Sequence, residues 1–262
     1  MSEDKISLDG VISKEGEKYI QDELAGASKL DKTAIITVGG PGSGKSHAAA
    51  ALMMQLKQPK KQFVTVDPDD ILGKLFGMDN NMRDDPNGVE PIKEKLFAQA
   101  MQEGYNILYD GTGKNYDKYL KVIERLNRAG YNIYLCIVVV HGMDIVMGRI
   151  AARETLTHRI VPEQFVYDTY DQLKENIDKY LNLGCDIVKN IFLYDNTNNT
   201  VMEIRSTCDK DGKKIFSALP MKGGKATRRT KSRSNSRAKS RTKSKSRSKS
   251  KSRSKSKSRG KK

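Results

Sequence analysis

Eight consecutive residues, Gly39 to Ser46, carry the strongest chemical signal in the chain. Their sequence, Gly-Gly-Pro-Gly-Ser-Gly-Lys-Ser, fits the spacing G-x-x-x-x-G-K-[ST]. Glycines let backbone N–H groups approach a phosphate closely, while the lysine reaches the β- and γ-phosphates and the serine hydroxyl reaches Mg²⁺. The pattern predicts a nucleoside triphosphate site, and its alternative is a glycine-rich turn with an incidental lysine. The expected nucleotide-binding residues are Gly39, Gly40, Pro41, Gly42, Ser43, Gly44, Lys45 and Ser46, with Ser46 on Mg²⁺.

Three carboxylates, Asp67, Asp69 and Asp70, follow the apolar run 63–66. If that run is a strand of a parallel sheet, the carboxylates lie at the carboxyl edge, where α/β proteins bind ligands. A carboxylate there can take the proton of an attacking hydroxyl, which is the work of a general base. We expect Asp69 to be that base. The alternative is structural, since Asp69 or Asp70 could cap the helix that follows.

A second acidic turn begins at Asp110, at the end of the apolar run 106–109. Its place at the same predicted sheet edge indicates a functional role. Asp110 would either hold Mg²⁺ through water or bind the hydroxyl of an acceptor. The alternative is that Asp110 is an ordinary turn residue.

Arginines form the fourth signal. Arg149 and Arg153 are four residues apart and would share one helix face, and Arg159 lies one loop further on. A guanidinium is planar and permanently charged, so it stabilises the charge that spreads over a phosphoryl group during transfer. We expect a helix–loop–helix lid that brings these arginines to the phosphates. The alternative is a solvated basic face paired with Glu154.

Apolar runs and amphipathic segments alternate along the chain and must position these residues. This alternation predicts an α/β fold with a mostly parallel sheet and helices on both faces, followed by an antiparallel hairpin addition. The expected strands are 34–38, 63–66, 106–109, 133–140 and 191–194, with hairpin strands at 201–206 and 214–218. The expected helices are 14–24, 45–57, 69–75, 91–103, 116–129, 144–155 and 162–181.

Charge divides the chain into unequal parts. The net charge is +16, but residues 221–262 hold 20 of the 48 Lys and Arg and none of the 32 Asp and Glu, which leaves residues 1–220 at −4. We therefore expect a polar lead with one short helix at 1–31, a phosphate-loop domain at 32–220 and a disordered basic tail at 221–262. The tail would contact nucleic acid or other polyanions without sequence preference, serve nuclear import, or only add solubility.

Other features concern location. The longest apolar run, 133–140, is too short to span a bilayer, and the N-terminus lacks the pattern of a signal peptide. Three dispersed cysteines, Cys136, Cys185 and Cys208, give no sign of disulfides and fit a reducing compartment. These features predict a soluble intracellular protein without membrane contact. The tail is similar to those of nuclear proteins of eukaryotes and of viruses that infect them, so we expect the cytoplasm or nucleus of a eukaryotic cell.

Taken in order, these motifs resemble those of the zeta-toxin-type P-loop kinases over about residues 30–220. Besides the phosphate loop, the resemblance rests on a D-x-D step, the turn Asp110-Gly111-Thr112, the segment Arg159-Ile160-Val161-Pro162 and a late strand that ends at 194–196. It implies a P-loop NTPase fold with a helical lid, and ATP- and Mg²⁺-dependent phosphate transfer. The implied catalytic residues are Lys45, Asp69, Arg149, Arg153 and Arg159, and the implied acceptor-site residues are Asp110, Thr112 and Lys114.

The acceptor-site turn departs from the family pattern. The family's usual sequence is Glu-Gly-Thr-x-Arg, whereas this chain has Asp110 for the glutamate and Lys114 for the arginine. The resemblance thus implies a kinase that acts on a hydroxyl, in toxin members that of a nucleotide sugar, with the acceptor of this chain left open. Two alternatives are a polynucleotide kinase or nucleic-acid-associated ATPase tethered by the tail, and a non-enzymatic, ATP-gated packaging or scaffold protein.

Overall fold

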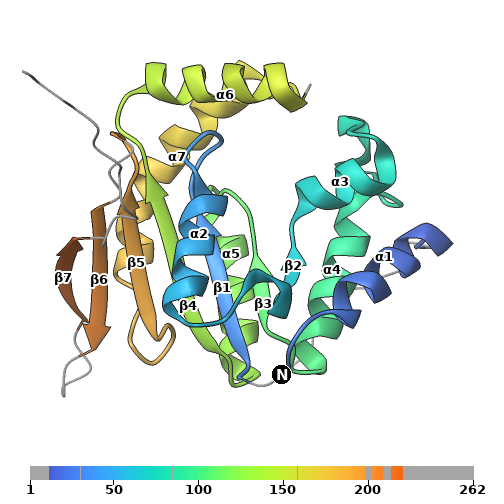
Figure 1. Cartoon of the computed structure of the whole chain (residues 1–262), viewed down its shortest axis with the longest axis horizontal. Helices are drawn as coiled ribbons and strands as arrows, with labels where there is room; N and C mark the ends of the chain where they lie inside the picture. The colour runs from blue at the N-terminus through green and yellow to red at the C-terminus, as the bar shows by residue number, and fades with distance from the viewer. Residues whose placement is uncertain are drawn as a thin grey trace, which may run out of the picture. The chain divides into compact units, whose positions relative to one another are not determined.

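The computed structural model describes residues 12–29, 31–83, 85–157, 159–198, 202–208 and 214–220. The predicted tail at 221–262 lies outside these residues. The described part alternates strands and helices as the sequence indicates, and its elements are labelled in Figure 1. The α/β fold expected from the sequence is confirmed.

A seven-stranded sheet runs through the middle of the fold in the order β2-β3-β1-β4-β5-β6-β7. The first five strands are parallel, and β6 and β7 add antiparallel to β5 as the predicted hairpin. Strand β1 lies between β3 and β4, with Ile35 paired to Leu108 and to Tyr134. The strands are β1 Thr33–Val38, β2 Val64–Val66, β3 Ile107–Tyr109, β4 Asn132–Val139, β5 Asn190–Asp195, β6 Met202–Cys208 and β7 Lys214–Pro220.

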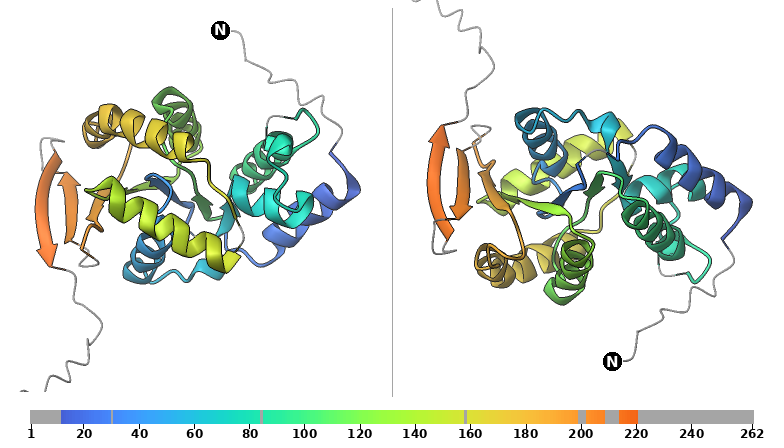
Figure 2. Two further views of the ribbon diagram at one scale, coloured as in Figure 1. Left: turned by 90° about the horizontal axis from the view of Figure 1, so that it is seen from above. Right: turned by 90° about the horizontal axis from the view of Figure 1, so that it is seen from below.

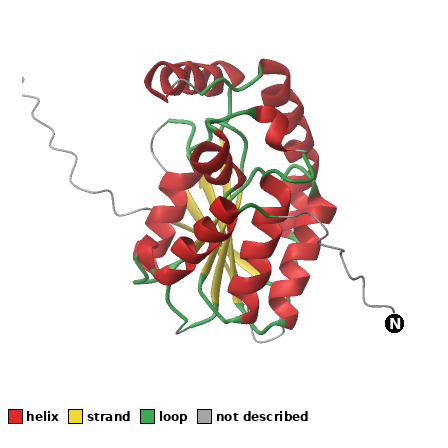
Figure 3. Cartoon of the chain, turned by 90° about the vertical axis from the view of Figure 1, so that its right-hand side faces the viewer, coloured by secondary structure: helices red, strands yellow, loops and turns green. Residues whose placement is uncertain are grey.

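Helices cover both faces of the sheet because successive strand side chains alternate between the faces. Ile36 on one face belongs to the large core cluster that includes helices α1, α4 and α5, and Ile35 on the other packs with residues of α2. Figure 3 shows the strands enclosed between these helices. The helices are α1 Lys14–Ala25, α2 Lys45–Gln55, α3 Pro68–Phe76, α4 Val89–Gln102, α5 Tyr116–Arg128, α6 Met143–Thr157 and α7 Glu163–Leu181, with short 3-10 turns at Lys60–Gln62 and Asn80–Arg83.

The helices α6 and α7 form the expected helix–loop–helix. They share a small core of their own, built on Val146, Ile150 and Val166. Figures 1 and 2 show α6 lying across the carboxyl ends of the strands, beside the loop between β1 and α2. The fold therefore brings the arginine-bearing segment to the same edge as the phosphate loop.

One alternative and one expectation need correction. The cap of α3 is Asp67, whose side chain accepts from the Asp69 N–H at 2.8 Å, so Asp69 and Asp70 lie inside the first turn and neither is the cap. The prediction that the cysteines form no disulfide was wrong for Cys185, which is disulfide-bonded, whereas Cys136 is buried and is not part of a disulfide. In the described part of the chain, no helix is both long and apolar enough to cross a membrane.

Candidate active site

The phosphate loop joins the centre of the sheet to α2. Strand β1 ends at Val38 and α2 begins at Lys45, with Gly44 as its first flanking residue. Gly42 and Gly44 have φ values of 73° and 90°, a backbone conformation that residues with a Cβ rarely adopt. The start of a helix presents N–H groups that have no intrahelical partner, and such groups beside a glycine-rich loop can bind an anion.

Lys45 lies at the centre of a group of acidic side chains. Its ammonium contacts the carbonyl of Gly40 at 3.2 Å. Burial lowers the pKa of Lys45, and the negative charges of Asp110, Asp69 and Asp67 act against that shift. The lysine is thus within electrostatic range of all three carboxylates, as a phosphate-binding lysine beside a transfer site must be.

Asp69 is held between two guanidinium groups. Arg83 donates to its Oδ1 at 2.6 Å, and Arg159 donates to its Oδ2. Burial by itself raises the pKa of Asp69, but Arg159 and Arg83 together outweigh burial and leave the pKa below its ordinary value. The structure therefore brings one predicted lid arginine onto the predicted base, together with Arg83, which the sequence did not single out.

Asp67 and Asp110 complete the acidic edge. Burial, with the nearby charges of Asp110 and Asp69, raises the pKa of Asp67 to about 6. Asp110 accepts a hydrogen bond from the Thr37 hydroxyl. The carboxylates of Asp67 and Asp110 are hard oxygen donors of the kind that Mg²⁺ prefers. Ser46 is exposed at the start of α2.

The other predicted residues have mixed positions. Arg153 is exposed but within electrostatic range of Lys45. The backbone carbonyl of Thr112 accepts a hydrogen bond from the Gly39 N–H at 2.9 Å, which connects the turn after β3 to the phosphate loop. The Lys114 ammonium lies 4.4 Å from the centre of the Phe165 ring on α7, so it is stacked on the lid helix.

Arg149 contacts backbone carbonyls at and beside the phosphate loop. Its guanidinium donates to the carbonyl of Asn196 at 2.7 Å and to that of Gly42 at 3.4 Å. Two further side chains make similar contacts. The hydroxyl of Tyr170, which the sequence did not single out, donates to Pro41 O at 3.0 Å, and the amide of Asn196, the last residue of the 194–196 motif, donates to Ser43 O at 2.8 Å. No local pattern marks these contacts, because α6, α7 and the turn after β5 come together only in the folded chain.

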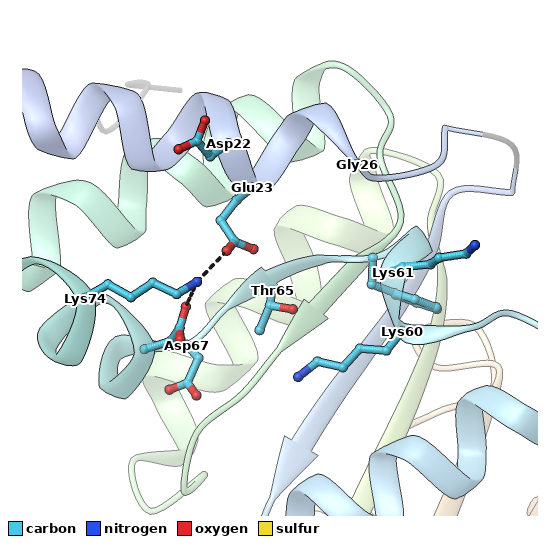
Figure 4. A pocket seen from close by; sticks show the side chains of 10 residues that line it. Asp22, Glu23, Gly26, Lys60, Lys61, Thr65, Asp67 and Lys74 are labelled. Atoms are coloured by element: carbon cyan, nitrogen blue, oxygen red, sulfur yellow. Dashed lines mark hydrogen bonds and ion pairs between the residues drawn. The ribbon is translucent and has the colours of Figure 1, made fainter.

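A cavity of about 430 Å³ lies beside β2. At one end Lys74 forms ion pairs with Glu23 and Asp70. Figure 4 shows Lys74 reaching Glu23, and the Lys60 side chain extending toward Thr65. Asp67 also lines it, whereas Lys45 and Asp69 do not. The candidate site is therefore defined by the side chains that meet at the phosphate loop and not by this cavity.

Comparisons with known proteins place the chain in a family. The Zeta toxin family model matches residues 18–207. The chain is 24% identical to Toxin zeta of Streptococcus pyogenes and 23% identical to that of Enterococcus hirae, in each case over 71% of its own length. It spans 63% and 64% of those two relatives.

Solved structures agree at the level of the fold. One, from work on the PezAT chromosomal toxin–antitoxin system of Streptococcus pneumoniae, has a TM-score of 0.51 and 17% identity, and covers 77% of this chain and 78% of its own. The AvrRxo1-ORF1:AvrRxo1-ORF2 structure with ATP has a TM-score of 0.53 and 14% identity. The match covers 77% of this chain and 64% of that one. The organisms named for these relatives are bacteria, so a eukaryotic location stays a prediction. Since the family model matches most of its residues, the chain belongs to the zeta toxin family.

Proposed function

We propose that this protein is an ATP-dependent phosphotransferase that moves the γ-phosphate of ATP to a hydroxyl acceptor. The observation that carries the proposal is the meeting of Lys45, Asp69 and Arg159 at one sheet edge. They supply a phosphate-binding ammonium, a carboxylate for the acceptor proton and a lid guanidinium for the transferred charge. The family match and a fold shared with a structure that contains ATP support it.

The contacts of Asp69 define what must change before transfer. Each carboxylate oxygen accepts a hydrogen bond from a guanidinium group, and these two arginines compete with an acceptor hydroxyl for the lone pairs that a base needs. When ATP binds, its γ-phosphate competes for Arg159, because a phosphate carries more charge than one carboxylate. Arg159 then leaves Oδ2, and Asp69 takes the proton of the acceptor hydroxyl while Arg83 keeps its orientation. The acceptor oxygen bonds to the γ-phosphorus as the bond to the β-phosphate oxygen breaks.

Mg²⁺ fits the acidic edge described above, with the Ser46 hydroxyl and the carboxylates of Asp67 and Asp110 as the groups that would hold it. Bound there, it would neutralise charge on the β- and γ-phosphates. The residues of this chain position the reactants: Lys45 holds the phosphates, Arg153 and Arg159 approach from the lid, and Asp110 is positioned by Thr37 for the metal or for the acceptor.

The acceptor stays open within this proposal. Asp110 and Thr112 lie at the sheet edge where an acceptor would enter, but the Lys114 ammonium is stacked on Phe165. A nucleotide sugar, the acceptor implied by the family resemblance, is the first candidate to test. The alternative of a polynucleotide kinase depends on the tail, which lies outside the described residues. The alternative of a packaging protein predicts ATP binding without a phosphorylated product.

The test is phosphate transfer from γ-labelled ATP to a panel of nucleotide sugars, nucleosides and oligonucleotides. We expect Asp69→Asn to lose at least about a hundredfold in turnover, the usual contribution of a general base, while it keeps ATP affinity. The matched control is Asp70→Asn on the same turn, since Asp70 contacts Tyr19 and Lys74. Unchanged turnover in Asp69→Asn would remove Asp69 as the base, and ATP binding without any labelled product would overturn the proposal.

A further inference from the structure

Three successive carbonyls of the phosphate loop are each held by a side chain from a different element. Tyr170 of α7 donates to Pro41 O, Arg149 of α6 donates to Gly42 O, and Asn196 after β5 donates to Ser43 O. Burial raises the pKa of Tyr170, so its hydroxyl stays protonated and remains a donor. Arg149 also donates to Asn196 O, which links two of the three donors.

Peptide planarity turns these contacts into a statement about the other side of the loop. In a trans peptide, the C=O of one residue and the N–H of the next point in opposite directions. Holding Pro41 O outward therefore directs the Gly42 N–H inward, and holding Ser43 O outward does the same for the Gly44 N–H. Neither N–H has a partner among the residues the structure describes. These two donors are thus available to an anion in the loop.

The peptide between them closes the turn. Its carbonyl, Gly42 O, is held by Arg149, and its N–H, on Ser43, donates to Gly40 O at 3.2 Å. Lys45 also donates to Gly40 O, a contact within the loop that incoming phosphates would replace. The loop therefore needs few changes in backbone direction to receive phosphate.

Close packing keeps two of the donors in place. A Cβ at Gly40 would lie 2.3 Å from the Tyr170 ring, and a Cβ at Gly44 would lie 2.4 Å from the Asn196 amide nitrogen. The ring and the amide therefore occupy space that only glycine leaves open. The glycines at these two positions serve the surrounding donors as well as the phosphate.

We propose that Tyr170, Arg149 and Asn196 are positioning residues that hold the phosphate loop in its phosphate-binding shape before nucleotide arrives. A loop that is already ordered before binding does not have to be ordered when nucleotide binds, so this entropic cost does not reduce the affinity. Arg149 then acts on the loop and not, as the sequence suggested, on the transferred phosphate. The inference rests on the proposed function only in requiring that the loop bind ATP, and it holds for any acceptor.

The test compares Tyr170→Phe with Tyr167→Phe. The first removes one hydroxyl and keeps the ring over Gly40, and the second makes the same change at a half-exposed position of the same helix. Calorimetric titration of each variant and of the unchanged protein uses two probes, ATP and inorganic tripolyphosphate, which has phosphates but no base. Thermal melting of the unliganded proteins reports any general loss of fold.

We expect Tyr170→Phe to lower the affinity for both probes by a similar factor, about three- to tenfold, which is the range for one hydrogen bond. Asn196→Ala should likewise lower the affinity for both probes, and Tyr167→Phe should change neither affinity. If Tyr170→Phe leaves both affinities unchanged, or weakens ATP alone, the inference is overturned, because the hydroxyl would then not act through the phosphates. If the unchanged protein binds neither probe, the proposed function fails together with it.

Discussion

The contact between Asp69 and Arg159 makes a quantitative prediction about the nucleotide-free protein. The perturbation is a double-mutant cycle of Asp69→Asn, Arg159→Gln and both together. A shielded charge-assisted hydrogen bond stabilises by about 1.5–3 kcal/mol, and an exposed ion pair by about 0.2–1 kcal/mol. The Asp69 side chain is 33% exposed and that of Arg159 17% exposed. We therefore expect a coupling of about 1–2 kcal/mol, between these limits.

The assay is urea unfolding of the four proteins at pH 7 without nucleotide, repeated with saturating ATP. With ATP the coupling should fall below about 0.5 kcal/mol, the usual limit of additivity, because Arg159 has moved to the γ-phosphate. A parallel cycle on Asp69 and Arg83 is the control, and its coupling should persist with ATP. A coupling between Asp69 and Arg159 that survives ATP binding would refute the exchange on which the proposed mechanism depends.

The same cycle has a pH signature. Because the folded pKa of Asp69 is lowered, its pair contributes stability above the ordinary aspartate pKa of about 4, and this contribution is lost as the pH falls below that value. The coupling should therefore be constant from pH 6 to 8 and shrink in acid. A coupling that grew in acid would mean that the carboxylate is not the partner of Arg159.

Three further predictions concern single side chains. Because the pKa of Asp67 is raised to about 6, the stability of the wild-type protein falls as the pH rises from about 4 to 6. Asp67→Asn keeps an acceptor for the helix cap and should therefore be more stable than the wild type at pH 7.5, by about 1–2 kcal/mol in urea unfolding. At about pH 4 the variant should show no advantage. Gly40→Ala should lower the affinity for ATP at least about tenfold in calorimetry, because its Cβ displaces the Tyr170 ring. An unchanged affinity would contradict that packing. Tyr180→Phe removes a buried 2.7 Å hydrogen bond to Gly113 O and should lower the free energy of unfolding by about 1 kcal/mol, whereas an equally stable variant would show the bond to be replaceable.

Local sequence patterns predicted the elements of this fold well. Each expected helix or strand is present to within a few residues, because strong periodicity and apolar runs specify elements without reference to distant parts of the chain. The 3-10 turn at 80–83 escaped prediction, and with it Arg83, since a short polar turn has no periodic signal. The cap of α3 is Asp67 and not, as the structural alternative had it, Asp69 or Asp70, because all three are suitable capping residues and only the backbone geometry distinguishes them.

The candidate site was predictable where it follows the chain and not where distant segments meet. The phosphate loop and Asp69 follow strands directly, so their place at the sheet edge could be inferred. The spacing of Arg149 and Arg153 indicated a shared helix face, but it could not show that Arg149 contacts loop carbonyls while Arg153 stays exposed. Tyr170 and Asn196 lie far from the loop in sequence, and their contacts depend on how the helices pack.

The central position of β1 has a consequence for how the domain would respond to a ligand. All six of its residues are buried, and it is paired on both sides, so its amides should exchange with solvent only when the whole domain unfolds. The phosphate loop continues directly from this strand. A nucleotide held there would slow amide exchange throughout the sheet, and not only around its binding site, because occupancy of the loop is thermodynamically linked to global unfolding.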